Sequence, residues 1–377
     1  MQGSVIDRVG LALACAGRPG SRRLMARAGG TSALPSGWEA AARAEIERVA
    51  RIGAFILEPA DARFPPLLRE AADPPPVLFG RGTPAPEDRL AVAVVGARRA
   101  TPWGADFARR LARDLAGAGF TVVSGLARGI DAAAHRGAIE GGGRTIAVLG
   151  SGLDTVYPAE HRRLAEMIAG TGVLMTELPL GTPPLARHFP ERNRLIAGMA
   201  WATVVVEAAR NSGSLITAAL ALEGGRLVFA VPGPPGEPNA EGTNGLLRAG
   251  AHCCRGAEDV IEDLAPQIAE AAARVAAARA AERGADGEAG AARGRVAPDR
   301  DAGAGLDADA RRVLAALSPA RGADLASLER ATRIAPGPLL AALLELELRG
   351  LATQLPGQRF VARAARAGRE QRDLTRA

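Results

Sequence analysis

Glycine and arginine follow the ends of several apolar runs in this sequence, and these residue types suit the binding of phosphate. One run leads into the segment SGLARGID (124–131), in which Gly125 and Gly129 precede the start of an expected helix. Glycine permits the close approach of another backbone, and the N–H groups at a helix start attract anions. We therefore expect Ser124, Gly125 and Gly129 to offer a hydroxyl and amides to a phosphate, with Arg128 projecting from the turn.

The bulk composition excludes several classes of protein. With 377 residues, 47% of them hydrophobic, the chain is long enough for two or three domains. No apolar run approaches the roughly 18 residues of a membrane span, and Asp7 interrupts the pattern of a secretion signal. Three cysteines and four scattered histidines suggest neither a disulfide framework nor a metal motif. We expect a cytoplasmic protein without metal, cofactor or membrane contact.

The formal charge of +6 invites a nucleic-acid interpretation, but its composition weakens that argument. All 47 basic residues are arginine, and the accompanying excess of alanine and glycine is typical of a GC-rich genome. The positions of individual arginines are therefore more informative than their number. Arginine suits phosphate through its planar fork of donors.

Apolar runs alternate with helical stretches from residue 91 onward. The runs are AVAVVG (91–96), FTVVSG (120–125), TIAVLG (145–150), GVLMTE (172–177), ATVVVEA (202–208), LVFAVPG (227–233) and the short AHCC (251–254). A helix is expected over 103–118, where Trp103, Phe107, Leu111 and Leu115 form one stripe. Such runs indicate an α/β fold with a doubly wound, mostly parallel sheet covered on both faces. Ligands of such sheets bind beyond the carboxyl ends of the strands.

The chain divides into five expected segments. They are a helical N-terminal region with a Pro-rich approach to the sheet (1–80), the sheet domain (81–264), an Ala/Arg/Gly-rich linker (265–304), a winged-helix domain (305–364) and a basic tail (365–377). Within the first segment, we expect helices over residues 6–15, 20–28 and 37–52.

Three amphipathic helices and two short strands indicate the winged-helix domain. In members that read DNA, the third helix enters the groove. Here that helix holds Glu345 and Glu347 but only one basic residue, Arg349. Direct DNA binding and a protein-interaction or dimerisation role both stay open for this domain.

The motifs of the sheet domain occur together and in order. They are VAVVGARRATPWG, VVSGLARGIDAAAHRGAIEGGGRTIAVLGSGLDTVYPAEH, HFPERNRLIAGM and VVVEAARNSGSLITAALALEGGRLVFAVPG. From about residue 55 to 262 the chain resembles the DNA-processing protein A family (DprA, also called Smf), and its last domain is similar to that family's winged helix. The resemblance implies an extended Rossmann-like fold, dimerisation through that domain, binding of single-stranded DNA, displacement of single-strand binding protein, and loading of RecA recombinase in natural transformation. It implies no catalytic activity.

The resemblance places the end of the first strand in a DNA-binding site. This strand ends in Gly96-Ala97-Arg98, where the family usually has serine or threonine in the middle position. Ala97 removes one side-chain donor and leaves the backbone amides, while Arg98 is expected to clamp a phosphate. The alternative for Arg98 is a structural pairing with Asp131, which itself is better suited to a cap than to a ligand.

Two further strand ends complete the expected site. In FPERNR, the residues Arg192, Asn193 and Arg194 lie at a helix start and could reach a phosphate or a base edge. Capping of nearby carbonyls by Arg194 is the alternative. In NSGSLITAA, the amides of Gly213 and Ser214 open another helix and can meet an anion.

Aromatic residues, at 3% of the chain, limit the surface on which bases could stack. Tyr157, Phe189 and Trp201 are candidates because they fall in or near strand-end loops, with core packing as the alternative for each. His135 and His161 are expected at the surface.

Two other classes of function stay open. Phosphoribohydrolases use a similar sheet with a Gly-Gly-x-Gly-Thr-x-x-Glu loop, where this chain has Ala218 and Ala219 in place of the acid. Glu177 or Glu207, both at strand ends, could substitute for that carboxylate. A transcription regulator that binds duplex DNA through its winged helix is the other alternative.

Overall fold

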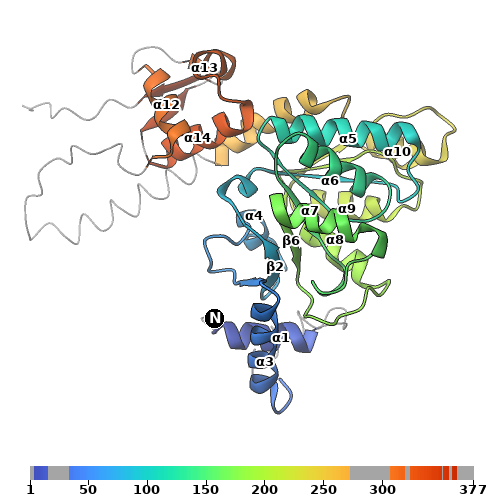
Figure 1. The fold of residues 1–377 in the computed structure, drawn as a ribbon. Coiled ribbons are helices and arrows are strands. Elements are labelled where there is room, and N and C mark those ends of the chain that lie inside the picture. The colour runs from blue at the N-terminus through green and yellow to red at the C-terminus, as the bar shows by residue number, and fades with distance from the viewer. Residues whose placement is uncertain are drawn as a thin grey trace, which may run out of the picture. The chain divides into compact units, whose positions relative to one another are not determined.

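The computed structural model describes residues 4–15, 34–271, 306–318, 323–349, 351–355 and 359–362. The chain forms two compact units, Met1–Leu264 and Ala265–Ala377, each with its own sheet (Figure 1). The helix expected over 20–28, most of the linker and the basic tail lie outside the described residues. Within those residues, none of the helices is long and apolar enough to cross a bilayer.

The first unit contains a nine-stranded sheet in the order β1-β2-β6-β5-β4-β3-β7-β8-β9. Its parallel strands are β3 (Ala91–Val95), β4 (Thr121–Ser124), β5 (Thr145–Val148), β6 (Val173–Thr176), β7 (Ala202–Val205), β8 (Leu227–Ala230) and β9 (His252–Cys253). From β3 the chain adds strands on one side as far as β6, and it then crosses to the other side to form β7. The predicted doubly wound, mostly parallel sheet is confirmed, and its topological switch point lies between β3 and β7.

Two strands in the N-terminal region were not expected. β1 (Phe55–Leu57) pairs antiparallel with β2 (Leu78–Gly82), and β2 pairs antiparallel with β6. The Pro-rich segment therefore ends inside the sheet, whereas the sequence predicted only an extended approach to it. Proline is disfavoured in sheets, and three prolines at 74–76, followed by Val77, lie just before β2.

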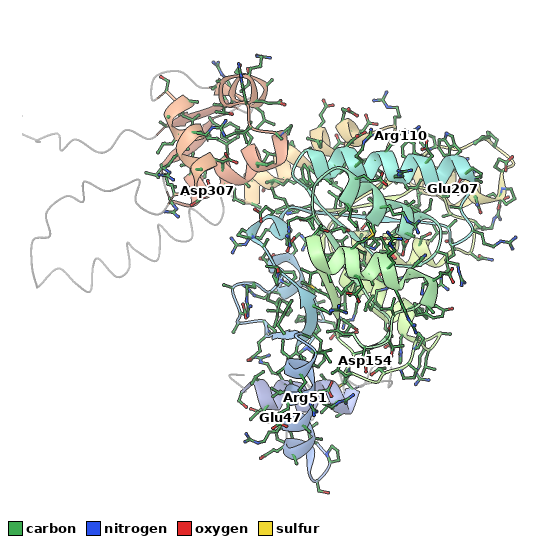
Figure 2. All side chains as sticks on the ribbon, in the orientation of Figure 1. Glu47, Arg51, Arg110, Asp154, Glu207 and Asp307 are labelled. Atoms are coloured by element: carbon green, nitrogen blue, oxygen red, sulfur yellow. The ribbon has the colours of Figure 1, made fainter. Side chains whose placement is uncertain are left out.

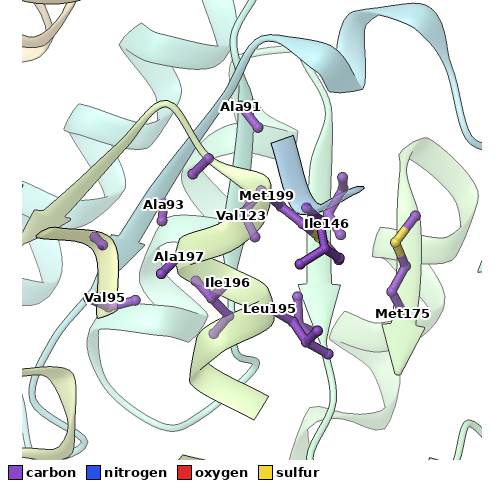
Figure 3. Close-up of a cluster of buried hydrophobic side chains, with 14 of the residues drawn as sticks. Ala91, Ala93, Val95, Val123, Ile146, Met175, Leu195, Ile196, Ala197 and Met199 are labelled. Atoms are coloured by element: carbon purple, nitrogen blue, oxygen red, sulfur yellow. The ribbon is translucent and has the colours of Figure 1, made fainter. Parts of the chain in front are cut away.

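Helices cover both faces of the sheet, as the alternation of apolar runs predicts. They are α1 (Val5–Cys15), α3 (Trp38–Arg51), α4 (Pro66–Arg69), α5 (Pro102–Gly117), α6 (Ile130–Glu140), α7 (Arg162–Thr171), α8 (His188–Met199), α9 (Gly213–Glu223) and α10 (Glu241–Arg248). Ile146 of β5 belongs to a core beneath α8, with Leu195 and Ile196 (Figure 3). The neighbouring Ala147 belongs to the opposite core, with Ile168 of α7. Adjacent strand residues thus feed two cores.

The predicted apolar stripe of α5 holds for only part of the helix. Leu111 and Leu115 are buried, whereas Trp103 is 51% exposed. Residues four apart on a helix drift by about 40° at each step, so Trp103 is turned about 120° from Leu115. Apolar residues that recur every four positions over the length of this helix therefore cannot all face the same core.

The second unit has the predicted winged-helix architecture. Its elements are α12 (Ala308–Ala316), β10 (Ala323–Asp324), α13 (Leu325–Thr332), α14 (Pro336–Leu348), β11 (Ala352–Leu355) and β12 (Arg359–Ala362). Val313, Leu328, Leu343 and Phe360 belong to its core. In α14, the third helix, Glu347 is buried and Glu345 pairs with Arg349.

Candidate nucleic-acid interface

A cleft of about 860 Å³ opens beyond the carboxyl ends of β3 and β7. Its walls include residues 96–99 after β3, residues 209–214 after β7, and the first turns of α8. The chain leaves β3 and β7 toward opposite sides of the sheet, so the loops that follow these strands diverge and leave space. The cleft therefore occupies the position where doubly wound sheets bind their ligands.

The charges that line the cleft favour an anion. The cleft is lined by four basic residues and only two acidic ones. The basic residues are Arg98, Arg99, Arg192 and Arg210, and the acidic residues are Asp131 and Glu241. Arg210 pairs with Glu241 at 3.5 Å across the rim. Arg98 and Arg99 are exposed, and within the described residues neither guanidinium group makes an ion pair or a hydrogen bond. Two cations are thus available to an anionic ligand.

An aromatic surface lies beside these cations. The guanidinium of Arg98 lies over the Phe189 ring, 5.0 Å from its centroid, and the Tyr157 ring is tilted against Phe189 at 5.6 Å. Tyr157 is 42% exposed, and both rings line the cleft. Trp201 does not line the cleft, because its indole N–H donates to the Arg89 carbonyl elsewhere. The cleft therefore combines cations with ring faces.

Arg192 forms part of the floor of the cleft. Its guanidinium is buried and donates to the carbonyl oxygens of Gly125, at 2.7 Å, and of Val148. A Cβ at position 125 would lie 2.4 Å from this guanidinium, so a larger residue there would displace Arg192 from its position. Burial lowers the pKa of Arg192 to about 10, and the group stays charged at neutral pH. In the described part of the chain its Nε has no hydrogen-bond partner.

The loop after β4 does not form the cradle that the sequence predicts. The fully buried Ser124 hydroxyl donates to the Val94 carbonyl at 2.6 Å. Asp131 accepts hydrogen bonds from the amides of Gly125 and Ala127, as expected of a structural cap. Burial raises the pKa of this carboxyl, while Arg192 acts in the opposite direction. Ser124 and Gly125 therefore direct these donors to groups within the protein and not toward the cleft.

Arg128 and Gly129 are also absent from the cleft lining. Arg128 instead donates two hydrogen bonds to Glu160, which lies just before α7 in the chain, at 2.6 and 2.8 Å. Gly129 has a φ of +72°, and a Cβ there would lie 2.2 Å from the Ala97 carbonyl oxygen. This glycine lets the β4 loop pass close behind the β3 loop, which is a structural role.

The three residues of FPERNR that the sequence predicts for the site do not all lie in the cleft. Arg192 and Asn193 line the cleft, and the Asn193 amide group donates to the Gly213 carbonyl at 3.2 Å. Arg194 lies away from the cleft, where it pairs with Glu177 and donates to the backbone of Asp73. The structural alternative is correct for Arg194.

The start of α9 is open to the cleft. Gly213 and Ser214 both line it, and a Cβ on Gly213 would meet nothing within 4 Å. The Ser212 hydroxyl caps the helix by accepting from the Ser214 amide at 3.4 Å. Gly96 and Ala97, at the end of β3, line the opposite wall. These placements bring together residues more than 110 positions apart in the sequence.

The carboxylates that an enzyme of this fold could use are engaged elsewhere. Glu207 accepts hydrogen bonds from the Thr101 amide and hydroxyl, at 2.9 and 2.5 Å, and so holds the start of α5. Glu177 pairs with Arg194. Within the described residues there is also no group of three His, Cys, Asp or Glu side chains that could hold a metal ion.

Both histidines expected at the surface are buried. His135 is fully buried and its Nδ1 lies 2.7 Å from the Thr145 hydroxyl. His161 lies 2.8 Å from the carbonyl oxygen of Leu126, a residue with a φ of +58°. They help to fix the loops behind the cleft.

Family comparisons agree with this architecture. A model of the DNA recombination-mediator protein A family matches residues 55–265, which is more than half of the chain. The chain belongs to the DNA recombination-mediator protein A family. A model of the DprA winged helix domain matches residues 297–358.

Two curated relatives illustrate the extent of the similarity. Protein Smf of Escherichia coli is 46% identical over 210 residues, which cover 55% of this chain and 56% of that protein. The chain thus matches only about half the length of this relative. Protein Smf of Synechocystis is 36% identical over 322 residues, with 81% of this chain and 80% of that protein covered.

Two solved structures of this family are similar to the chain. DNA processing protein A of Streptococcus pneumoniae has a TM-score of 0.58 and 31% identity, covering 70% of this chain and 98% of its own. DNA processing protein A of Helicobacter pylori has a TM-score of 0.51 and 30% identity, covering 56% and 95%. The latter structure is described as showing a unique mode of single-stranded DNA binding.

Sequence reasoning missed several residues of the cleft in this family member. Arg99, Arg210 and Asn239 all line it. Arg99 directly follows Arg98, and Arg210 directly precedes the NSGS motif, so adjacency to a recognised motif was the available signal. Asn239 lies in the loop before α10, where the sequence shows no motif.

Proposed function

We propose that this protein binds single-stranded DNA in the cleft at the switch point of its sheet. The observation that carries the proposal is the proximity of two exposed cations, Arg98 and Arg99, which make no ion pair among the described residues, to the Tyr157 and Phe189 rings that line the cleft. Binding of single strands without sequence preference requires cations for phosphates and ring faces for bases. The Helicobacter pylori relative, which is described as binding single-stranded DNA, supports the same ligand class.

Each group has a defined part in this proposal. Arg98 and Arg99 contact phosphates directly, and the Gly213 amide is the donor at the start of α9, because the Ser214 amide is bound to the Ser212 hydroxyl. Arg192 contributes positive potential from beneath the ligand. Gly96, Ala97 and Asn193 complete the lining of the walls, and the missing hydroxyl at Ala97 leaves the amides as the donors at this point.

The cleft is suited to binding and not to catalysis. Asp131 already accepts two amide hydrogen bonds, and Glu241 pairs with Arg210. We propose that the protein has no glycosidase activity, since no lining carboxylate is unengaged in the part of the chain that the structure describes. Incubation with nucleoside monophosphates should release no free base, and the release of base would support the phosphoribohydrolase alternative.

We also propose, on the basis of family membership, that the protein loads RecA recombinase onto DNA covered by single-strand binding protein. The family description as a recombination mediator supports this step. RecA filament assembly on such DNA should accelerate when the protein is added. A homodimer formed through the first unit is the expected assembly, and sedimentation of the purified chain tests it.

A titration of matched single-stranded and duplex oligonucleotides tests the central proposal. The full chain should prefer the single strand, and the preference should depend on Arg98. A regulator acting through the winged helix would prefer duplex DNA, although α14 ends before Arg349 and that arginine pairs with Glu345. Preferential duplex binding that survives Arg98→Ala would favour that regulator.

A further inference from the structure

Trp103 is an exposed indole on the first turn of α5, just outside the cleft. Its side chain is 51% exposed, and its ring stacks on Phe107 with centroids 5.4 Å apart and planes 27° apart. Phe107 packs on one face of the indole and holds the ring in place, while the rest of the ring is exposed. Aromatic faces of this kind are the surfaces on which unpaired bases stack.

The first turn of α5 is held firmly. The Thr101 hydroxyl caps the helix by accepting from the Gly104 amide at 3.0 Å, and the Glu207 carboxylate accepts from the Thr101 amide. A Cβ on Gly104 would lie 2.3 Å from the Glu207 carboxyl carbon, so helix and carboxylate are in close contact. Trp103 lies between these fixed positions and presents its ring from a rigid support.

This turn is continuous with the wall of the cleft. Asn239, which lines the cleft, donates to the Arg99 carbonyl at 3.0 Å and to Glu207 at 3.4 Å. The carboxylate that fixes α5 therefore also fixes a cleft residue. Four residues lie between Arg98 and Trp103, so the five Cα–Cα steps limit their Cα separation to about 18 Å. Figure 2 labels Glu207 beside this helix.

The charges between the cleft and Trp103 suit a sugar–phosphate backbone. Arg99 is exposed next to Arg98, and the positive end of the α5 dipole lies at Thr101. Farther along the helix, Arg110 is exposed, although Asp106 pairs with it at 2.5 Å. Among the described acids at the start of α5, Glu207 is engaged by Thr101 and Asp106 by Arg110.

We propose that Trp103 is a second base-stacking position for a nucleotide of the same strand, after that strand has passed Arg99. The inference rests on the proposed function, because it requires single-stranded DNA in the cleft. The occupant is one continuous strand, so a short oligonucleotide fills the cleft alone and a longer one also reaches Trp103.

Affinity as a function of strand length gives the first test. Oligothymidylates of about 4 to about 16 nucleotides span the usual site sizes of single-strand-binding domains. The full-length wild-type protein should bind the longest strands more tightly than Trp103→Ala does, by about 5- to 150-fold for one lost stack. The shortest strands should bind both proteins equally. Leu222→Ala, at another exposed apolar residue (57%), is the matched control and should behave as wild type.

Tryptophan fluorescence gives a second test that does not depend on an alanine variant. The other tryptophans, Trp38 and Trp201, are only partly exposed. Long strands should quench the wild-type emission, and Trp103→Phe should bind them while losing most of the quenching. Quenching that persists in Trp103→Phe, or an identical length dependence for wild type and Trp103→Ala, overturns the inference and leaves the cleft proposal intact. Failure of the folded wild type to bind any strand overturns the cleft proposal first.

Discussion

The guanidinium carbon of Arg98 lies 5.0 Å from the centre of the Phe189 ring, so a cation and an aromatic face share one position at the mouth of the cleft. The guanidinium carbon of Arg192 lies 5.9 Å from the centre of the same ring. The ring is thus close to two cations: a buried one, which is bound to backbone carbonyls, and an exposed one that is available to a ligand. This arrangement can hold a phosphate and a base next to each other.

Replacement of Arg98 by alanine should weaken the binding of every single strand to a similar degree. The loss of one charged contact corresponds to about 1.5 to 3 kcal/mol, or about 10- to 150-fold in affinity. Fluorescence anisotropy with labelled homopolymers measures the change. Arg109→Ala is the control, because Arg109 is an exposed arginine that pairs with Glu140 and does not line the cleft. Equal affinities for Arg98→Ala and wild type would remove Arg98 from the site.

Replacement of Glu241 by glutamine should strengthen binding. Glu241 is an acid on the rim of the cleft, and it partly neutralises Arg210 at 3.5 Å. Its removal at an exposed site corresponds to about 1 kcal/mol, or about fivefold in affinity. Glu166→Gln is a suitable control, since Glu166 pairs with Arg81 away from the cleft. Weaker binding by Glu241→Gln would mean that this carboxylate orders the rim and does not repel the ligand.

Replacement of Glu207 by glutamine should reduce stability while the folded variant keeps its affinity for DNA. An amide can accept only part of the hydrogen bonds that the carboxylate accepts from Thr101 and Asn239. The expected loss is about 1 to 3 kcal/mol of unfolding free energy, seen as a lower urea midpoint. Glu223→Gln, at an exposed acid of α9, should change the midpoint little. A stable Glu207→Gln that no longer binds DNA would show that the contacts of Glu207 with Thr101 and Asn239 are required to form the ligand site.

His135 should make stability depend on pH below neutrality. Thr145 donates its one proton to the Val122 carbonyl, so His135 Nδ1 donates to Thr145 and the unprotonated Nε2 has no partner among the described residues. Burial lowers the pKa of His135 from 6.5 to about 3. Between pH 6.5 and about 3, His135 is therefore protonated in the unfolded chain and neutral in the folded chain. The free energy of unfolding decreases as the pH is lowered through that window.

The size of this effect can be isolated with His135→Leu, in which Thr145 keeps its bond to Val122. Wild type should lose about 1.4 kcal/mol more per pH unit than the variant as the pH falls below 6.5. Urea unfolding at a series of pH values measures both slopes. Parallel slopes for the two proteins would show that His135 is protonated in the folded state.

The sheet and its order of helices could be predicted because each parallel strand is a short apolar run that feeds two cores, as Ile146 and Ala147 do. The site was predictable only in part. Whether Ser124 faces a ligand or the core depends on the pleat of β4, and a one-residue change of register would reverse it. The sequence also cannot show which loop amides are used internally, as those that bind Asp131 are.

The salt dependence of single-strand binding tests the central claim most directly. Phosphate contacts release counterions, so the logarithm of the affinity should fall linearly with the logarithm of salt concentration, by about 0.7 per contact. Arg98→Ala should reduce the magnitude of that slope by about one such contact, while Arg109→Ala should leave it unchanged. An affinity for single strands that is independent of salt, or a slope that Arg98→Ala does not alter, would contradict the account.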